Sequence, residues 1–447
     1  MRDLSIIILA AGKGTRMKST LPKVLNKVAS KEIVNMVVNI SKTLTPKNLF
    51  TVISADINSV KENILKHYKK VNFVIQKDRY GSGHAVKIAV KEIQKQDKLG
   101  KNVLILCADV PLIKEETLKN MYEDITKKES SITVLAFHTR NTNKKYGRLL
   151  TRKNEIEKII EYKDATRGEK EITLCNSGVI VVDGNLLPKL LDKIDNKNAS
   201  KEYYLTDIVK IAREMGLRST FIEAEEDEVI GINSKIDLAE AERIMQDRLR
   251  KKFMTEGVTF IDPNTVYLSH DTEIGKDVTI YPNVFFGEGV KIKNNVEIKS
   301  FSHIEGGIIE EGASIGPFAR IRKGTHVNRG ARVGNFVEIK NSEIKAGVKV
   351  GHLSYIGDSE VGENSNIGAG TITCNYDGVN KYKTIIGKNA FIGSNTALVA
   401  PVKIGDGALV AAGSTITKDV KKDDLAIARA EQVEIEGLGK KKLCKKK

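Results

Sequence analysis

The sequence of 447 residues is short of cysteine, and its few cysteines lie far apart. They are Cys107, Cys175, Cys374 and Cys444. Their spacings match neither a metal-binding motif nor a disulfide framework, which excludes a small disulfide-stapled secreted domain. The cysteine pattern therefore predicts a soluble protein in a reducing, cytoplasmic compartment.

Long apolar runs are also missing. No stretch of the chain approaches the ~18 apolar residues that a membrane-spanning helix needs. The longest run near the N-terminus, Leu4–Ala11, leads into Gly-Lys-Gly and has no small-residue cleavage site. We therefore expect a strand here rather than a signal peptide, and no membrane span in the protein.

Aromatic residues make up only 5% of the chain, with no tryptophan, although the net charge is +16. Six of the positive charges lie in the last eight residues, a Lys-rich tail. The others are spread along the chain without interleaved aromatic residues or a nucleic-acid-binding motif, so we expect no nucleic-acid partner. A basic surface instead suits an enzyme that binds small phosphorylated substrates.

Residues 1–235 alternate between short β-branched runs and amphipathic stretches. The predicted strands are Ser5–Ala10, Leu49–Ile53, Phe73–Gln76, Val103–Cys107, Ile132–Phe137 and Val179–Val182. The predicted helices are Lys31–Thr43, Ile57–Tyr68, Gly83–Lys95, Glu115–Thr126 and Leu205–Met215. This alternation is typical of an α/β domain with a mostly parallel, Rossmann-like sheet covered by helices on both faces. Ligands of such sheets bind beyond the carboxyl ends of the strands, so the loops after strands are candidate sites.

Residues 236–256 are predicted to form a helical linker. Ser234 followed three residues later by Asp237 is a typical helix start. Apolar residues then recur at helical spacing, at Leu238, Ala241, Met245 and Leu249. One connecting helix accounts for all of these features.

From residue 257 onward, apolar and mostly aliphatic residues recur about every six positions. The series runs through Ile274, Ile280, Phe286, Ile292, Ile298, Ile304, Ile315, Ile321, Val327, Val333, Ile339, Ile344, Val350, Ile356, Val361, Ile367, Ile386, Ile392, Leu398, Ile404, Val410 and Ile416. A period of six fits a β-helix whose coils each hold three hexapeptides, with these side chains inside. Residues 373–385 break the period, so we expect them to loop outwards. The predicted second domain covers residues 257–447, including the Lys-rich tail.

The segment L-A-A-G-K-G-T-R-M, at residues 9–17, follows the first predicted strand directly. Gly12 and Gly14 allow backbone N–H groups to turn toward a phosphate or a base. Arg16 can hold a phosphate with two hydrogen bonds, and Lys23 in L-P-K-V-L supplies a second charge. A plain tight turn fits the glycines equally, because their spacing is neither that of a Rossmann loop nor that of a Walker loop.

The apolar run Val103–Cys107 is followed by Asp109, close to the carboxyl end of the predicted strand. A carboxylate there can hold Mg²⁺ together with nucleotide phosphates, since magnesium takes few protein ligands. Asp109 could equally cap the turn that follows. The charges of Arg16 and Lys23 in the same sheet favour the metal site.

His352 lies two places after the inward position Val350 and is therefore predicted on the outside of the coil. A neutral imidazole near pH 7 is suited to general-base catalysis, and the positive charges of Arg322 and Lys340 favour the neutral form. An idle surface histidine fits the period as well.

Taken in order, these motifs resemble known enzyme families. Residues 1–235 resemble the sugar-1-phosphate nucleotidylyltransferases through L-A-A-G-K-G-T-R-M, L-P-K-V-L, G-S-G-H-A, A-D-V-P-L and E-Y-Y-L-T-D. Residues 257–447 resemble the left-handed β-helix acyltransferases through G-P-F-A-R-I-R, G-N-F-V-E-I-K, G-H-L-S-Y-I-G-D and N-I-G-A-G-T-I-T-C-N-Y-D-G. Together they resemble bifunctional enzymes that are both N-acetylglucosamine-1-phosphate uridylyltransferase and glucosamine-1-phosphate N-acetyltransferase.

The resemblance implies a first activity and its site residues in the N-terminal half. Uridylyl transfer from UTP to N-acetylglucosamine-1-phosphate would release pyrophosphate, with Arg16 and Lys23 facing the phosphates. Asp109 and Asn233 would hold Mg²⁺. The nucleotide and sugar would contact Leu9, Ala10, Ala11, Gly12, Lys23, Gln76, Gly81, Ser82, Gly147, Glu161, Asn176 and Asn233.

The resemblance implies a second activity in the β-helix. His352 would act as general base while the amine of glucosamine-1-phosphate attacks acetyl-CoA. The sugar phosphate would be held by Arg322, Lys340, Tyr355 and Asn366. The acetyl-CoA site would be lined by Ala369, Asn375, Tyr376, Ser394, Ala412 and Arg429. In the family these sites lie between neighbouring β-helices, which implies a homotrimer.

Two positions depart from the family pattern, and one alternative function stays open. Cys107-Ala108 stands where the family commonly has an aromatic or other residue followed by a glycine before the aspartate, so we expect the Ala108 methyl to weaken ligand binding without abolishing it. Ser82 replaces a commoner threonine and keeps the hydroxyl. The alternative is a sugar-1-phosphate nucleotidylyltransferase whose β-helix is only regulatory or oligomerising.

Overall fold

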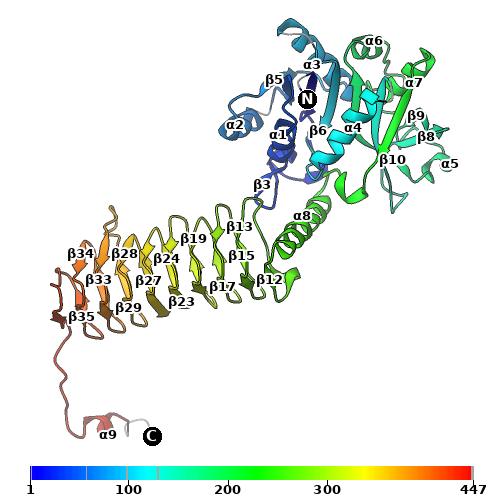
Figure 1. Ribbon diagram of the computed structural model, residues 1–447. Helices are drawn as coiled ribbons and strands as arrows, with labels where there is room; N and C mark the ends of the chain where they lie inside the picture. Colours follow the sequence, from blue (N-terminus) through cyan, green and yellow to red (C-terminus); the bar gives the residue numbers. More distant parts are fainter. Residues whose placement is uncertain (2, 57, 97–98, 128–129, 444–447) are drawn as a thin grey trace. The chain divides into compact units, whose positions relative to one another are not determined.

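The computed structural model describes residues 1, 3–56, 58–96, 99–127 and 130–443. The chain forms two compact units, Met1–Met245 and Gln246–Lys447 (Figure 1). The boundary between them lies inside helix α8 (Lys235–Thr255), at the place of the predicted linker helix. None of the helices in the described ranges is long and apolar enough to cross a membrane.

A nine-stranded sheet forms the centre of the first unit. Seven strands follow the order β11-β7-β10-β6-β1-β4-β5, and the β8–β9 hairpin adjoins β10. Their bounds are β1 Leu4–Leu9, β4 Asn48–Ser54, β5 Asn72–Gln76, β6 Asn102–Cys107, β7 Ile132–His138, β8 Arg148–Arg152, β9 Glu155–Ile160, β10 Leu174–Asp183 and β11 Ser219–Glu223. Strand β10 is antiparallel to β6 and β7, whereas β1–β4, β1–β6, β4–β5 and β7–β11 are parallel pairs. The predicted mostly parallel sheet is confirmed.

Helices cover both faces of this sheet because its strands bury alternate residues on opposite sides. Ile6 and Ile8 of β1 belong to one core cluster with residues of α1 and α4, and Ile7 belongs to a second with residues of α3 and α7. The helices are α1 Ile33–Thr43, α2 Asn58–His67, α3 Ser82–Gln96, α4 Glu115–Lys127, α5 Arg167–Lys170, α6 Leu187–Asp192, α7 Asp207–Glu214, α8 Lys235–Thr255 and α9 Leu438–Leu443. The 3₁₀ turns are η1 Thr15–Met17, η2 Lys23–Leu25, η3 Glu226–Glu228 and η4 Pro263–Thr265.

Several predicted bounds are wrong for local reasons. The helix predicted from Lys31 begins at Ile33, because Ala29 and Ser30, both at positive φ, turn a small hairpin of β2 (Lys27–Val28) and β3 (Lys31–Glu32).

The helix predicted from Leu205 begins at Asp207, since the backbone N–H of Leu205 donates to the Ser82 hydroxyl. Ile57, predicted as the first residue of a helix, lies outside the described residues. Strands β8, β9 and β11 were not predicted at all.

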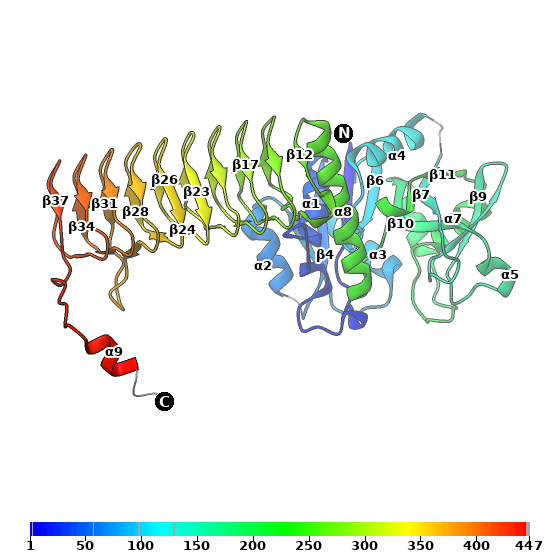
Figure 2. The same cartoon turned by 90° about the horizontal axis from the view of Figure 1, so that it is seen from below.

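The second unit is a parallel β-helix built from three ladders of short strands (Figure 2). One ladder holds β12 Thr259–Phe260, β14 Thr279–Ile280, β17 Glu297–Ile298, β20 Ser314–Ile315, β23 Arg332–Asn335, β26 Lys349–His352, β29 Asn366–Ile367, β32 Phe391–Ile392, β35 Leu409–Val410 and β37 Leu425–Ala426. The second holds β13 Glu273–Ile274, β16 Lys291–Ile292, β19 Ile308–Ile309, β22 His326–Val327, β25 Glu343–Ile344, β28 Ser359–Val361, β31 Thr384–Ile386 and β34 Val402–Ile404. The third holds β15 Phe285–Phe286, β18 His303–Ile304, β21 Arg320–Ile321, β24 Glu338–Lys340, β27 Tyr355–Gly357, β30 Ile372–Cys374, β33 Ala397–Val399 and β36 Thr415–Ile416.

The six-residue period marks the interior of the coils, as predicted. The apolar residues of the series are buried, except that Ile274 in the first coil is half-buried. The predicted outward loop 373–385 is too long at both ends. Thr373 and Thr384 are buried and lie in β30 and β31, so only residues 375–383 leave the coil.

Candidate functional site

A cavity of about 520 Å³ opens at the carboxyl ends of β1, β5 and β6 in the first unit. Leu9 ends β1, and the glycine-containing loop after it forms one wall. The predicted nucleotide residues that line the cavity are Leu9, Ala10, Ala11, Gly12, Lys23, Gln76, Gly81, Ser82 and Asp109. The structure thus brings together most of the residues predicted for nucleotide binding.

Lys23 joins the two predicted metal ligands. Its ammonium group lies 2.5 Å from a carboxylate oxygen of Asp109 and 3.1 Å from the amide oxygen of Asn233. Two hard oxygen atoms therefore already converge on one cation, which is the donor set that a divalent ion such as Mg²⁺ requires. Asp109 and Asn233 are the candidate metal ligands; among the described residues, no group of three or more His, Cys, Asp or Glu side chains could hold a metal ion.

Arg79 is a cavity residue that the sequence analysis missed. Its guanidinium donates to the Ala11 carbonyl at 3.0 Å, to the Ser54 hydroxyl at 2.7 Å and to the Asp56 carboxylate at 2.6 Å. These bonds hold the glycine-containing loop against the end of β4. Its position before G-S-G-H-A in the sequence carries no signal of this role.

Arg16 is not among the described residues that line this cavity. It lies in the 3₁₀ turn η1 and its side chain is exposed. The predicted role of Arg16 at the phosphates therefore stays a prediction.

The G-S-G-H-A motif packs against the E-Y-Y-L-T-D segment, and hydrogen bonds join the two motifs. The backbone N–H of Gly83 donates to the Tyr203 carbonyl at 2.8 Å, and the Ser82 hydroxyl accepts from the Leu205 N–H at 3.0 Å. The amide of Gln76 contacts the His84 ring at 3.3 Å. The Ser82 hydroxyl is thus a structural anchor in this chain.

The predicted sugar residues lie beside the cavity rather than in its lining. Gly147 accepts a backbone hydrogen bond from Asn176 at 2.9 Å. Glu161 is largely buried and accepts from the Thr206 hydroxyl at 3.0 Å, and burial raises the pKa of its carboxyl group. Glu161 lines a separate cavity together with Asp164 and Tyr204.

Ala108 is not among the described residues that line the cavity, and its effect on ligand binding stays a prediction. Its side chain is fully buried in the core cluster that contains Leu106 and Ala10. Side chains on a strand alternate between faces, and the extension of β6 turns Ala108 away from the cavity that Cys107 lines.

Cys107 is predicted to be unreactive despite its place at the cavity. Burial, with Asp109 adding to it, raises the pKa of the Cys107 thiol to about 12. At pH 8 only about one thiol in 10⁴ is ionised, and the thiolate is the reactive form. Alkylation of the folded chain with iodoacetamide, mapped by peptide mass spectrometry, should leave Cys107 unlabelled while denatured chain is labelled. Equal labelling of Cys107 in the folded and denatured chain would contradict this.

In the β-helix, His352 lies at the end of β26 with its side chain exposed, as predicted. One ring nitrogen, Nδ1, is hydrogen-bonded to the side-chain oxygen of Asn335 in the neighbouring coil. An amide oxygen can only accept, so Nδ1 donates this hydrogen bond, and in the neutral ring the free lone pair is then on Nε2. This is the tautomer that a general base needs. Asn335 was missed by the sequence analysis.

The predicted sugar-phosphate residues lie on the neighbouring coils. Arg322 donates to Glu338 at 2.9 Å, and Tyr355 is paired with Glu338 in the same ladder. The ammonium of Lys381, in the outward loop, lies close to that of Lys340 and lowers its pKa. Two cations held together in this way attract an anion, so Lys381 is a further candidate for phosphate binding.

The residues predicted for acetyl-CoA lie on the outward loop and on the coils before and after it. Asn375 is buried and its amide donates to Asp358, whereas Tyr376 is exposed and donates to the Gly378 carbonyl. Arg429 donates to the Ala412 carbonyl at 2.6 Å. Asn366 and Ala369 are half-buried, and Ser394 is exposed.

The fold and these two constellations define a class of protein. A family model for a MobA-like NTP transferase domain matches residues 6–174. A bacterial transferase hexapeptide (six repeats) model matches residues 271–306, and a hexapeptide repeat of succinyl-transferase matches residues 383–418. The chain is a nucleotidyltransferase domain joined to a left-handed β-helix of hexapeptide repeats.

Whole-chain relatives give the particular family. Bifunctional protein GlmU of Paramagnetospirillum magneticum is 47% identical over 438 residues, covering 97% of this chain and 95% of that protein. Bifunctional protein GlmU of Zymomonas mobilis is 47% identical over 437 residues, covering 96% and 95%. Among solved structures, apo UDP-glucose pyrophosphorylase is 16% identical, with a TM-score of 0.45, over 55% of this chain and 99% of its own. The chain belongs to the GlmU family and is a bifunctional enzyme, a uridylyltransferase and acetyltransferase.

Proposed function

We propose that the chain makes UDP-N-acetylglucosamine in two steps at two sites. Residues 257–447 transfer acetyl from acetyl-CoA to glucosamine-1-phosphate, and residues 1–235 transfer uridylyl from UTP to the resulting N-acetylglucosamine-1-phosphate. Residues 236–256 link the two domains. One observation carries the proposal: each unit of the chain has its own set of side chains suited to one of these reactions. The predicted cytoplasmic location stays a prediction.

In the acetyl transfer, His352 is the general base. Nδ1 is held by Asn335, so Nε2 takes a proton from the sugar amine as the amine attacks the thioester carbonyl. The new bond is an amide, and coenzyme A leaves as the thiol once its sulfur is protonated. The cations of Arg322, Lys340 and Lys381 hold the phosphate and so place the amine.

In the uridylyl transfer, the sugar phosphate attacks the α-phosphorus of UTP and pyrophosphate leaves. Positioning and charge neutralisation account for most of the catalysis in such steps, so no protein nucleophile is needed. Asp109 and Asn233 would hold Mg²⁺, which neutralises phosphate charge when bound. Lys23 contacts the same two oxygen atoms, and with a metal ion held there its ammonium group would instead be available to the nucleotide phosphates.

We also propose that the working form is a homotrimer. Phe301, Phe318 and Phe336 stack on one edge of the β-helix at centroid distances of 4.8 and 5.0 Å, and all three are exposed. Each has positive φ, a conformation that costs a bulky residue about 1–2 kcal/mol. Leu353, beside His352, continues this apolar edge at positive φ. A second copy packed on the edge would bury these side chains next to the acetyltransferase site.

If the protein works as a homotrimer, a substitution that breaks the trimer should also abolish acetyl transfer. Phe318→Asp should lower the sedimenting mass from three chains toward one and abolish acetyl transfer, because a charge is placed in a buried contact. Uridylyl transfer should persist. Sedimentation of the unmodified protein as a single chain would contradict the proposal.

The function itself is tested by two assays on one preparation. We expect thiol release from acetyl-CoA that depends on glucosamine-1-phosphate, and pyrophosphate release from UTP that depends on N-acetylglucosamine-1-phosphate and Mg²⁺. Pyrophosphate release without acetyl transfer would instead support the alternative, in which the β-helix is regulatory or oligomerising.

A further inference from the structure

Arg148, the first residue of β8, is fully buried in the first unit. Among the described residues no carboxylate forms an ion pair with it. A buried cation without a counter-ion is costly unless its donors are all satisfied. The hydrogen bonds of such a residue fix the positions of the groups that accept them. The partners of Arg148 therefore identify the segment that it holds in place.

The guanidinium of Arg148 bonds mainly to backbone carbonyls. It donates to the carbonyls of Tyr146 and Thr142, both at 2.7 Å, and of Lys144 at 3.2 Å. It also reaches the Lys170 carbonyl at 3.3 Å. Its charge lies 5.3 Å from the centre of the Tyr162 ring, which offers further compensation. The planar guanidinium group of Arg148 thus holds the loop 142–146 in place through several carbonyl groups.

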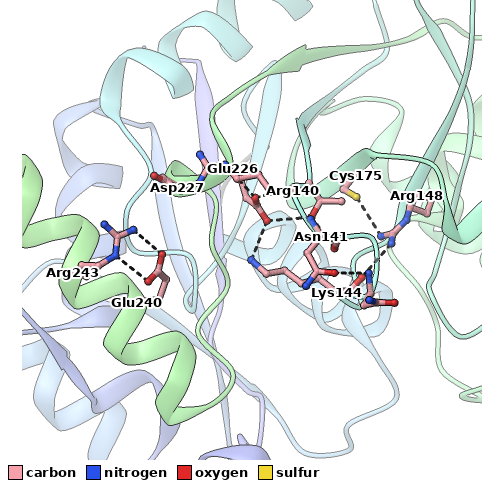
Figure 3. Close-up of polar contacts among 11 residues, drawn as sticks. Arg140, Asn141, Lys144, Arg148, Cys175, Glu226, Asp227, Glu240 and Arg243 are labelled. Atoms are coloured by element: carbon pink, nitrogen blue, oxygen red, sulfur yellow. Dashed lines mark hydrogen bonds and ion pairs between the residues drawn. The ribbon is translucent and has the colours of Figure 1, made fainter.

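Glu226 also holds this loop, through the side chain of Lys144. This carboxylate is 6% exposed and accepts from the Lys144 ammonium at 3.0 Å and from the Arg140 backbone N–H at 3.1 Å (Figure 3). Although burial opposes ionisation, these donors lower the pKa of Glu226, so it is charged. Glu226 thus holds the side chain of Lys144, whereas Arg148 holds backbone carbonyls of the same loop.

The pinned loop leads directly to the predicted sugar residues. Gly147 immediately precedes Arg148, and the Gly147 carbonyl accepts from the N–H of Asn176 at 2.9 Å. Arg148 also donates to the sulfur of Cys175, at 3.3 Å, the residue before Asn176 (Figure 3). Arg148 therefore contacts both segments of the chain that the Gly147–Asn176 hydrogen bond joins.

Asn176 connects this pair to the cavity. Its side-chain oxygen accepts from the Gly178 N–H at 3.0 Å, and a side chain at Gly178 would lie 3.1 Å from the sulfur of Cys107. Cys107 lines the nucleotide cavity. A shift of the Arg148 contacts would thus move Asn176 relative to the cavity wall.

We propose that Arg148 is a positioning residue for the sugar of the uridylyl acceptor. It does not touch substrate. Its bonds to the loop 142–146 and to Cys175 set the positions of Gly147 and Asn176, which are predicted to contact the sugar. The inference rests on the proposed function of this cavity. It predicts that Arg148 affects how the sugar is bound, and not nucleotide binding or phosphate chemistry.

The first test is Arg148→Lys, which keeps the charge but cannot bond to several carbonyls in one plane. We expect KM for N-acetylglucosamine-1-phosphate to rise about ten- to a hundredfold, with KM for UTP unchanged. Acetyl transfer by the same preparation should be unchanged, which serves as an internal control. Arg152→Lys is the matched control, because Arg152 ends the same strand with an exposed side chain.

A binding measurement separates positioning from general damage to the fold. Calorimetry with UDP and with UDP-N-acetylglucosamine gives the part of the affinity that the sugar supplies. Arg148→Lys should reduce that part while UDP binds as before. Cys175→Ala, which removes one contact and little volume, should shift the same quantity in the same direction by less.

Three results would overturn the inference. These are unchanged constants in Arg148→Lys, a parallel loss for UTP and sugar phosphate, or a parallel loss of UDP and UDP-N-acetylglucosamine binding. If Arg148→Lys does not fold, an unchanged sugar contribution in Cys175→Ala overturns it. Absence of pyrophosphate release by the unmodified protein would contradict the proposed function instead, so the two failures are distinguishable.

Discussion

Replacing His352 with alanine should abolish most acetyl transfer and leave uridylyl transfer intact. Loss of a positioned general base slows a reaction by about 10²–10⁴-fold, and the neutral imidazole of His352 has a ring nitrogen that can accept the proton of the amine. The measurement is thiol release from acetyl-CoA, run beside pyrophosphate release on the same sample. The contrast is large because His352 and the nucleotide cavity belong to different compact units.

Two further variants make this test specific. His303→Ala removes another exposed histidine of the same β-helix and should change neither activity. Asn335→Ala should reduce acetyl transfer by a smaller factor and alter its pH profile, since Nδ1 loses the partner that fixes its proton. Acetyl transfer that survives His352→Ala would mean that another group accepts the proton.

Lys23→Met should slow uridylyl transfer by about 10²–10³-fold, as expected when one pre-placed cation at the reacting phosphates is removed. Pyrophosphate release measures this, and acetyl transfer by the same sample reports that the chain is folded. Lys18→Met is the control, since Lys18 is an exposed lysine just beyond the same loop.

The contacts of Lys23 also predict an opposite effect on metal binding. The ammonium group occupies the oxygen atoms of Asp109 and Asn233, so it competes with a divalent cation when no nucleotide is present. Removing that charge should tighten Mn²⁺ binding to the free protein about tenfold, measured by electron paramagnetic resonance. Asp109→Ala should abolish this binding. Weaker Mn²⁺ binding in Lys23→Met would show that the lysine does not block the metal site.

Much of the architecture can be predicted from the sequence because its apolar residues recur at regular intervals. Alternation of strands and helices predicted the sheet, and the six-residue period predicted the β-helix interior, since each period states which side chains are buried. The places where prediction failed are those where a turn or a tertiary bond overrides the period. Lys31 joins a hairpin, and Leu205 donates to Ser82.

The residues of the candidate site form two groups in the same way, those that local patterns predict and those that only tertiary contacts identify. Asp109, Lys23 and His352 could be named because strand ends and outward positions follow from local patterns. Arg79, Asn335 and Lys381 could not, because their importance lies in contacts with residues farther away along the chain, which local patterns do not predict.

The sequence by itself determined which residues are inside the coils, where strands end, and which chemical groups stand there. These properties depend on local periods of two, about four and six residues. Only the tertiary structure decided which of those groups meet. Lys23 contacts Asp109, 86 residues away, and Asn233, 210 residues away, and the loop before Gly147 is held between Glu226 and Arg148. Such pairs depend on how elements pack, because the energy of a hydrogen bond or ion pair depends on distance in space and not along the chain.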